Sequence, residues 1–107
     1  TSPYTAMTAN APAALVLCSR KENIIVPELI EVDMALATEN ALLEIEAQGL
    51  GGVMLGVAPF GDRMEKVAKA INLPESLSVF TVVPFGYPAK KNPQQDRYDE
   101  ARVHYVR

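Results

Sequence analysis

The chain has 107 residues, of which 49% are hydrophobic and 21% are charged, and its formal net charge is -3. This length allows one domain at most, and the apolar fraction is sufficient for a packed core. The negative charge and the lack of a basic stripe argue against nucleic-acid binding. The sequence shows no signal peptide and no apolar run of membrane-spanning length, so we expect a cytoplasmic protein without membrane contact.

The first thirty residues contain one predicted strand. Residues Thr1 to Pro12 are rich in small and turn residues and lack periodicity, which indicates a loop. The apolar run Ala13 to Ser19 predicts a short strand. Its Cys18 is the only cysteine, which excludes an internal disulfide, and it should pack as a small hydrophobe because no base stands near it in the sequence. Pro27 interrupts the apolar segment Ile24 to Ile30, so a loop or a single turn is expected there.

A helix from Asp33 to about Gln48 is the central predicted element. Asp33 is a suitable N-cap because its carboxylate can accept hydrogen bonds from the N–H groups of the first turn. Gly49, directly after the helix, can adopt a left-handed conformation without steric cost, and Leu50 can then fold back onto Ile45. This combination predicts a Schellman motif at the end of the helix.

The central helix is apolar on more than one face. Its apolar residues cover more than the stripe of roughly 100° that a surface helix buries. One small sheet cannot easily cover such a helix, so we expect cover from a second subunit or from a further part of the protein. The residues concerned are Met34, Ala35, Leu36, Ala37, Ala41, Leu42, Leu43, Ile45 and Ala47.

Gly51 and Gly52 leave the turn after this helix without side chains. An outside group could therefore approach the backbone N–H donors of the turn closely. The alternative is that the glycines only turn the chain from helix into strand. The sequence GLGG is not a dinucleotide-binding fingerprint, because it follows a helix and lacks the GxGxxG spacing.

The second half of the chain is predicted to contain two strands and a helix. Gly52 to Val57 has no polar residue and predicts a strand buried on both faces. Asp62 and Glu65 form a capping-box pattern that predicts the start of the next helix. Leu77 to Val83 is the strongest predicted strand, because it combines β-branched and aromatic residues. The helix between them carries one apolar stripe, which consists of Met64, Val67, Ala68 and Ile71.

The C-terminal region is predicted to leave the sheet at a proline-rich turn. Pro84 cannot donate to a strand pair and Pro88 forces a turn, so the last strand should close within PFGYP. Ala89 to Asp99 is polar and irregular, whereas Arg102 to Arg107 could form a short strand that has no obvious partner in this chain. The order of strand, helix, strand, helix, strand and extended tail indicates an α/β sandwich-like layer in which helices cover a sheet.

Side chains suited to catalysis are scarce. The sequence has no GxSxG, P-loop, Cys/His ligand set or paired carboxylates, so neither a catalytic side chain nor a metal site is predicted. His104, the only histidine, is more typical of a surface or an interface. A donor-rich glycine turn and the basic segment Lys90 to Arg97 remain. They could hold an anionic cofactor whose own ring performs the chemistry; the alternative is that the charged segment is only solvated.

Four segments of the sequence resemble the later part of the FMN-dependent nitroreductase family. They are APAALVLCS, VDMALATENALLEIEAQGLGGVMLG, INLPESLSVFTVVPFGYPAKK and DRYDEARVHYVR. The resemblance covers nearly the whole chain and implies an α+β fold, a three-layer sandwich with a sheet covered by helices. It also implies a homodimer with FMN at the subunit interface, central helices that pack across the dimer and a C-terminal extension swapped onto the partner.

The resemblance further implies which residues bind FMN. The glycine turn would lie beside the flavin ring, where a backbone N–H near N5 or O4 would favour the reduced ring. A basic residue of the tail would bind the phosphate, and Arg97 is the best match. The implied cofactor-binding residues are Gly49, Leu50, Gly51, Gly52, Lys90, Lys91 and Arg97.

The activity implied by the resemblance is hydride transfer from NADH or NADPH to FMN, and then to a nitro compound, a quinone or a similar acceptor. The N-terminal segment with which the family grips FMN is absent from these 107 residues. We therefore expect residues 1–107 to be the C-terminal part of a single domain, completed by the missing segment and by a second subunit. The alternative is a non-catalytic binding or dimerisation module that keeps the fold and has lost the flavin.

Overall fold

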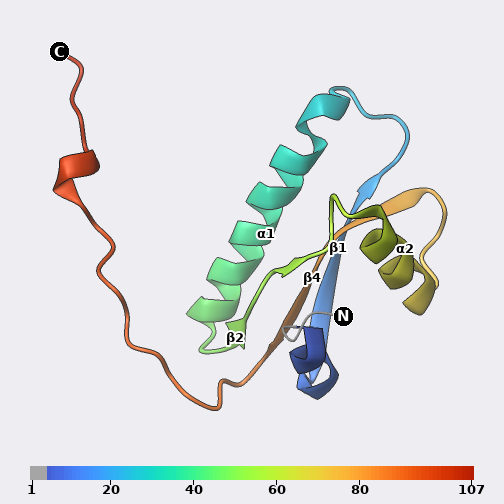
Figure 1. Cartoon of the computed structure of the whole chain (residues 1–107), viewed down its shortest axis with the longest axis horizontal. Helices are drawn as coiled ribbons and strands as arrows, with labels where there is room; N and C mark the ends of the chain where they lie inside the picture. Colours follow the sequence, from blue (N-terminus) through green and yellow to red (C-terminus); the bar gives the residue numbers. More distant parts are fainter. Residues whose placement is uncertain (1–4) are drawn as a thin grey trace.

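Within residues 5–107, which the computed structural model describes, two α-helices flank a four-stranded sheet (Figure 1). The helices are α1 (Ile30–Ala47) and α2 (Gly61–Ala70). The strands are β1 (Ala13–Arg20), β2 (Gly51–Gly52), β3 (Leu55–Gly56) and β4 (Leu77–Gly86). Short 3₁₀ turns span Thr5–Asn10, Pro27–Leu29 and Glu100–Arg102.

Strand β4 is the centre of the sheet, because every other described strand pairs with it. The strands β1 and β2 lie on its two sides, β3 also pairs with it, and all three pairings are antiparallel. Along β1 the register runs from Ala13 opposite Phe85 to Arg20 opposite Leu77. Figure 1 shows α1 on one side of these strands and α2 on the other. The structure therefore confirms the α+β class and the helix-covered sheet that the resemblance implies.

A hydrophobic core lies between the sheet and α2. Leu55, Val57, Val79 and Val82 are buried in it. The predicted stripe of α2 faces this core, except that Ile71 follows the end of the helix and is 44% exposed. The partly buried side chains that pack against the core are Val16, Cys18, Met64, Val67, Ala68 and Leu73.

Both helices begin before the residues that the sequence pattern selects. Helix α1 begins at Ile30, so Asp33 is not its N-cap but lies in its first turn. The Ile30 N–H donates to the Pro27 carbonyl, so the preceding 3₁₀ turn continues into the helix and no side-chain cap forms. Helix α2 begins at Gly61, and Asp62 does not form the predicted capping box. Both carboxylates still lie near the positive helix ends, where a negative charge is favourable.

The strand boundaries differ from the prediction around the glycines. The predicted strand Gly52 to Val57 is two separate two-residue strands, β2 and β3. Val53 and Met54 between them are 41% and 40% exposed, so this segment is not buried on both faces as predicted. Strand β4 extends through Pro84 to Gly86. Pro84 has no N–H to donate to a neighbouring strand, but its carbonyl accepts a hydrogen bond from the Val53 N–H at 3.4 Å.

The segments at the two ends of the chain were predicted less well. A 3₁₀ turn occupies Thr5–Asn10 within the predicted loop, whose residues 1–4 lie outside the described part. Residues Arg102 to Arg107 form no strand in the described chain, in which no strand lies beside them, so the possible pairing of this segment with a partner subunit stays a prediction. Instead, the Asp99 carboxylate accepts a hydrogen bond from the Ala101 N–H at 3.1 Å and starts a 3₁₀ turn.

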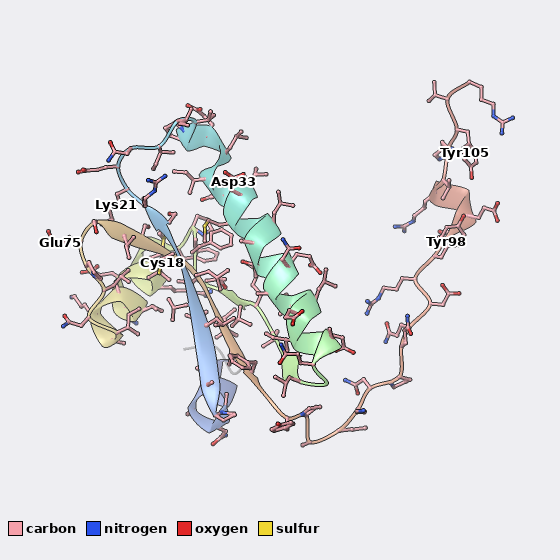
Figure 2. All side chains as sticks on the ribbon, turned by 180° about the vertical axis from the view of Figure 1, so that it is seen from behind. Cys18, Lys21, Asp33, Glu75, Tyr98 and Tyr105 are labelled. Carbon is pink, nitrogen blue, oxygen red and sulfur yellow. The ribbon has the colours of Figure 1, made fainter. Side chains whose placement is uncertain are left out.

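The tail after β4 leaves the body of the molecule. Figure 2 shows Tyr98 and Tyr105 on this extension, apart from the helices and the sheet. The radius of gyration is 16.6 Å, whereas a compact chain of this length has roughly 13 Å. The predicted polar, irregular segment Ala89 to Asp99 is confirmed, because it has no regular secondary structure and is exposed throughout.

Helix α1 carries large apolar side chains that the described residues leave uncovered. Val32, Leu36 and Leu43 are 53%, 62% and 59% exposed. Within this helix, only Thr38 and Ile45 are buried. As we expect from the sequence, the described chain therefore leaves the apolar surface of α1 uncovered. Cover of this surface by a second subunit or by a further part of the protein stays a prediction.

We predict that Gly52→Ala destabilises the fold more than Gly51→Ala does. A Cβ at Gly52 would lie 3.2 Å from Phe85 Cβ and from the Pro84 carbonyl oxygen, and 3.3 Å from Ile45 Cδ1. A Cβ at Gly51 would meet nothing closer than 3.4 Å. Crowding of a packed position costs about 1–3 kcal/mol, so thermal unfolding of the intact protein should give a lower midpoint for Gly52→Ala. Equal midpoints would contradict the packing described here.

Candidate functional site

The end of α1 fixes where the glycine turn begins. Gly49 has φ of +76°, and its N–H donates to the Glu46 carbonyl at 3.0 Å. The Leu50 N–H donates to the Ile45 carbonyl, also at 3.0 Å. These two bonds and the left-handed glycine are those of a Schellman motif, so the predicted helix end is confirmed.

The segment Gly51–Gly56, called the glycine ribbon below, then runs along β4. Gly52 lies opposite Phe85. The next residue, Val53, points its N–H at β4 and bonds to Pro84. Because successive N–H groups of a strand point to opposite sides, the Gly52 N–H points away from β4. Among the described strands nothing pairs with that edge, so this donor is available to a ligand.

A hollow of about 380 Å³ lies against the glycine turn, and we call it the lysine hollow. It brings Lys90 and Lys91, from the tail, together with the four glycine-turn residues implied by the resemblance. These groups are far apart in sequence and meet because β4 ends beside β2. The residues that line the hollow are Glu46, Gly49, Leu50, Gly51, Gly52, Pro88, Lys90, Lys91 and Asn92.

The charges around the lysine hollow favour an anion. Lys90 and Lys91 carry positive charges, and Glu46 is the only acidic residue in the lining. Charged N–H donors make short and strong hydrogen bonds to phosphate or carboxylate oxygens. A group with a phosphate near the lysines could therefore place its remaining atoms against the backbone of the glycine turn.

Arg97 does not line the lysine hollow of its own chain. It lies farther along the extended tail, where its Nη2 donates to Gln95 Oε1 at 2.9 Å. The structure therefore brings Lys90 and Lys91 to the glycine turn, but not the residue that the resemblance favours for the phosphate. Among the predicted cofactor-binding residues, Arg97 alone stands apart.

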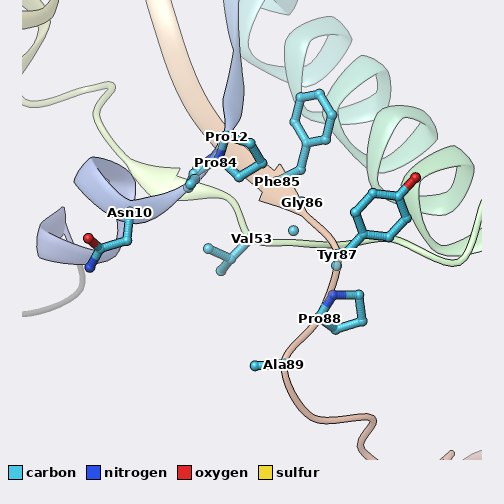
Figure 3. Close-up of a pocket in the computed structure, with 12 residues that line it drawn as sticks. Asn10, Pro12, Val53, Pro84, Phe85, Gly86, Tyr87, Pro88 and Ala89 are labelled. Carbon is cyan, nitrogen blue, oxygen red and sulfur yellow. The ribbon is translucent and has the colours of Figure 1, made fainter.

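A second hollow, of about 570 Å³, lies against the same glycines, and we call it the apolar hollow (Figure 3). It shares Gly51, Gly52 and Pro88 with the lysine hollow, and none of its lining residues carries a charge. The sequence does not indicate this hollow, because the pattern PFGYP predicts only the end of a strand. Its lining residues are Asn10, Ala11, Pro12, Gly51, Gly52, Val53, Pro84, Phe85, Gly86, Tyr87, Pro88 and Ala89.

Other chemically active residues lie away from these hollows. Cys18 packs against the core as predicted, and burial raises the pKa of its thiol, which therefore stays protonated at neutral pH. His104 is exposed on the tail. Residues 5–107 contain no group of three or more potential His, Cys, Asp or Glu metal ligands. None of the helices in this part of the chain is long and apolar enough to span a bilayer.

Comparison with known proteins relates this chain to one family. The model of the "Nitroreductase family" matches residues 3–87. A protein from Methanothermobacter thermautotrophicus named "Putative NADH dehydrogenase/NAD(P)H nitroreductase" is 36% identical over 102 residues, which are 95% of this chain and 53% of that protein. A solved structure named "Putative NADH Oxidase", from Clostridium acetobutylicum, is 38% identical with a TM-score of 0.86. That match covers 96% of this chain and 63% of the other.

A third similar protein is iodotyrosine deiodinase, whose solved structure is bound to FMN and 3-iodo-L-tyrosine. It is 30% identical with a TM-score of 0.66, and the match covers 90% of this chain and 47% of the other. This chain thus spans about half to two thirds of the length of these relatives. Because the family model matches most of the 107 residues, the chain belongs to the nitroreductase family.

Proposed function

We propose that this chain is part of an FMN-dependent oxidoreductase. It would pass two electrons, as hydride, from NADH or NADPH through FMN to a nitro compound, a quinone or a similar acceptor, in the cytoplasm. The observation that carries this proposal is the lysine hollow, in which two cations face a glycine turn with an outward N–H donor. Membership of the nitroreductase family and the FMN-bound relative support it.

The residues present in the lysine hollow fit FMN, which carries a phosphate at one end and a flat ring at the other. When bound, FMN supplies the hydride chemistry. Lys90 and Lys91 would hold the phosphate by charged hydrogen bonds. The glycines would let the ring approach the backbone, and the Gly52 N–H would donate to an acceptor atom of the ring without rearrangement. This division of roles requires no catalytic side chain from residues 1–107.

The proposal includes two partners for this chain, a second copy in a homodimer and the segment of the same protein that precedes residue 1. Three observations support them: the exposed apolar face of α1, the extended tail, and the partial span of this chain on its relatives. Both Figure 1 and Figure 2 show the tail on the α1 side of the molecule. A second copy seated beside α1 would thus also meet the tail.

Purification of the intact protein tests the proposed function. We expect a yellow protein with flavin absorbance. In the absence of oxygen, NADH or NADPH should bleach this absorbance, and a nitroaromatic compound or a quinone should then restore it. A colourless protein that FMN does not reconstitute would contradict the proposal. It would favour the alternative of a binding or dimerisation module that has lost the flavin.

Replacement of both hollow lysines should weaken FMN binding more than Arg97→Ala does. A charged hydrogen bond to phosphate contributes about 1.5–3 kcal/mol, or roughly 10- to 150-fold in Kd for each bond lost. Fluorescence titration of the intact protein would compare Lys90→Ala/Lys91→Ala with Arg97→Ala, and Lys66→Ala on α2 serves as a control cation outside the hollow. If only Arg97→Ala weakens binding, Arg97 holds the phosphate and the lysine assignment is wrong.

Gly51→Val should block the approach of the flavin ring while the fold persists. The position of a Cβ at Gly51 meets only Pro88 Cβ at 3.4 Å and the Gly86 carbonyl at 4.0 Å within this chain. Because Gly51 lines both hollows, a branched side chain at this position would reduce the space beside the glycine turn. We expect at least about a tenfold loss of FMN affinity, with Gly51→Ala as the milder control. Unchanged affinity in a folded Gly51→Val protein would remove the glycine turn from the site.

Charges on the exposed face of α1 should dissociate the homodimer. Leu36→Glu and Leu43→Glu would each put a carboxylate where the proposal places apolar contact, and an unpaired buried charge costs several kcal/mol. Light scattering of the intact protein should show a shift from dimer to monomer. Ala70→Glu, at an exposed position of α2, adds the same charge as a control. A dimer that withstands both leucine substitutions would show that α1 lies outside the interface.

A further inference from the structure

Two side chains hold neighbouring carbonyl groups in the second half of the glycine ribbon. On α2, Arg63 Nη1 donates to the Gly56 carbonyl at 2.8 Å. On β4, the Thr81 hydroxyl donates to the Leu55 carbonyl. The Arg63 guanidinium also lies 4.6 Å from the centre of the Phe60 ring, over its face. The far end of the ribbon is thus tied to a helix and to the central strand.

The glycine ribbon needs such ties because its own backbone supplies few. The strands β2 and β3 have two residues each, and among the described strands they pair only with β4. Three of the six residues in Gly51–Gly56 are glycines, which lose more conformational entropy on ordering than any other residue. The Schellman motif fixes the residues before the ribbon. The groups that hold the far end of the ribbon, at Leu55 and Gly56, therefore help to determine the direction of the Gly52 N–H.

We propose that Arg63 is a positioning residue that holds the glycine ribbon in the geometry that binds the cofactor. The link to FMN rests on the proposed function, whereas the tie between Arg63 and the ribbon does not. An arginine suits this role because its planar guanidinium can donate to a carbonyl while its face stacks on an aromatic ring. A charged donor also bonds a carbonyl more strongly than a neutral one does.

Arg63 is also the member of the pair that can be tested. Thr81 is fully buried, so its replacement would disturb the core as well as the bond to Leu55. Arg63 is exposed, and its replacement removes the bond to Gly56 without opening the core. Lys69 on the same helix is a matched control, because it is an exposed cation whose partner is Glu65, at 3.2 Å, and not the ribbon.

The experiment compares Arg63→Ala, Arg63→Lys and Lys69→Ala in the intact protein. Hydrogen–deuterium exchange of the amides of residues 51–57 is measured without flavin, and FMN affinity is measured by fluorescence titration. We expect Arg63→Ala to speed exchange of the ribbon by about tenfold and to weaken FMN binding by roughly fivefold. Arg63→Lys should recover part of both, because it keeps a cationic donor, and Lys69→Ala should change neither.

Each result bears on the proposal. Unchanged exchange in Arg63→Ala would overturn the positioning role, whether or not flavin binds. Faster exchange with unchanged FMN affinity would overturn the link to the cofactor. Faster exchange spread over β1 and β4 would mean a general loss of stability, and this result would also count against the positioning role of Arg63. If the wild-type protein takes up no FMN, the proposed function fails, and the exchange measurement alone decides whether Arg63 holds the ribbon.

Discussion

The left-handed glycine at the end of α1 is the constraint on which the rest of the site depends. At φ of +76°, Gly49 reverses the chain so that Leu50 bonds back to Ile45 and the next residues enter the sheet beside β4. A Cβ at Gly49 would meet no atom within 4 Å. The requirement for glycine is therefore conformational, since other residues pay about 1–2 kcal/mol in this region. A different exit angle would carry the glycine ribbon away from both hollows.

Strand β4 then brings the tail to the same place. Gly86 lies opposite Gly51, so the residues that follow β4 must leave the sheet next to the glycine turn. That exit places Pro88, Lys90 and Lys91 against the turn. The meeting of two segments that are distant in sequence is thus a consequence of one antiparallel register. The extension of β4 through Pro84 is essential to it, because a strand that ended at Val83 would release the tail earlier.

The sequence predicted the features that local rules determine. The end of α1 follows from Gly49 and Leu50, and the core face of α2 follows from a helical stripe. The helix starts differ from the prediction because the 3₁₀ turn Pro27–Leu29 continues into α1 ahead of Asp33, and because α2 begins directly after Phe60 without a side-chain cap from Asp62. The break in the glycine ribbon, the apolar hollow and the ties from Arg63 and Thr81 depend on contacts between distant segments, which no local pattern encodes. The resemblance pointed to lysines that the structure does bring to the glycine turn, and to Arg97, which it does not.

The uncovered surfaces of the chain follow from the same arrangement. Helix α1 can bury only the face that meets the sheet, so its remaining apolar side chains stay in water at a cost of roughly 25 cal/mol for each Å². The tail has no strand beside it, and both views place it on the α1 side of the molecule. The lysine hollow lies where this helix and this tail diverge. In the proposed homodimer, a partner that covered α1 and met the tail would also lie beside the lysine hollow, and assembly would then be linked to the proposed cofactor site.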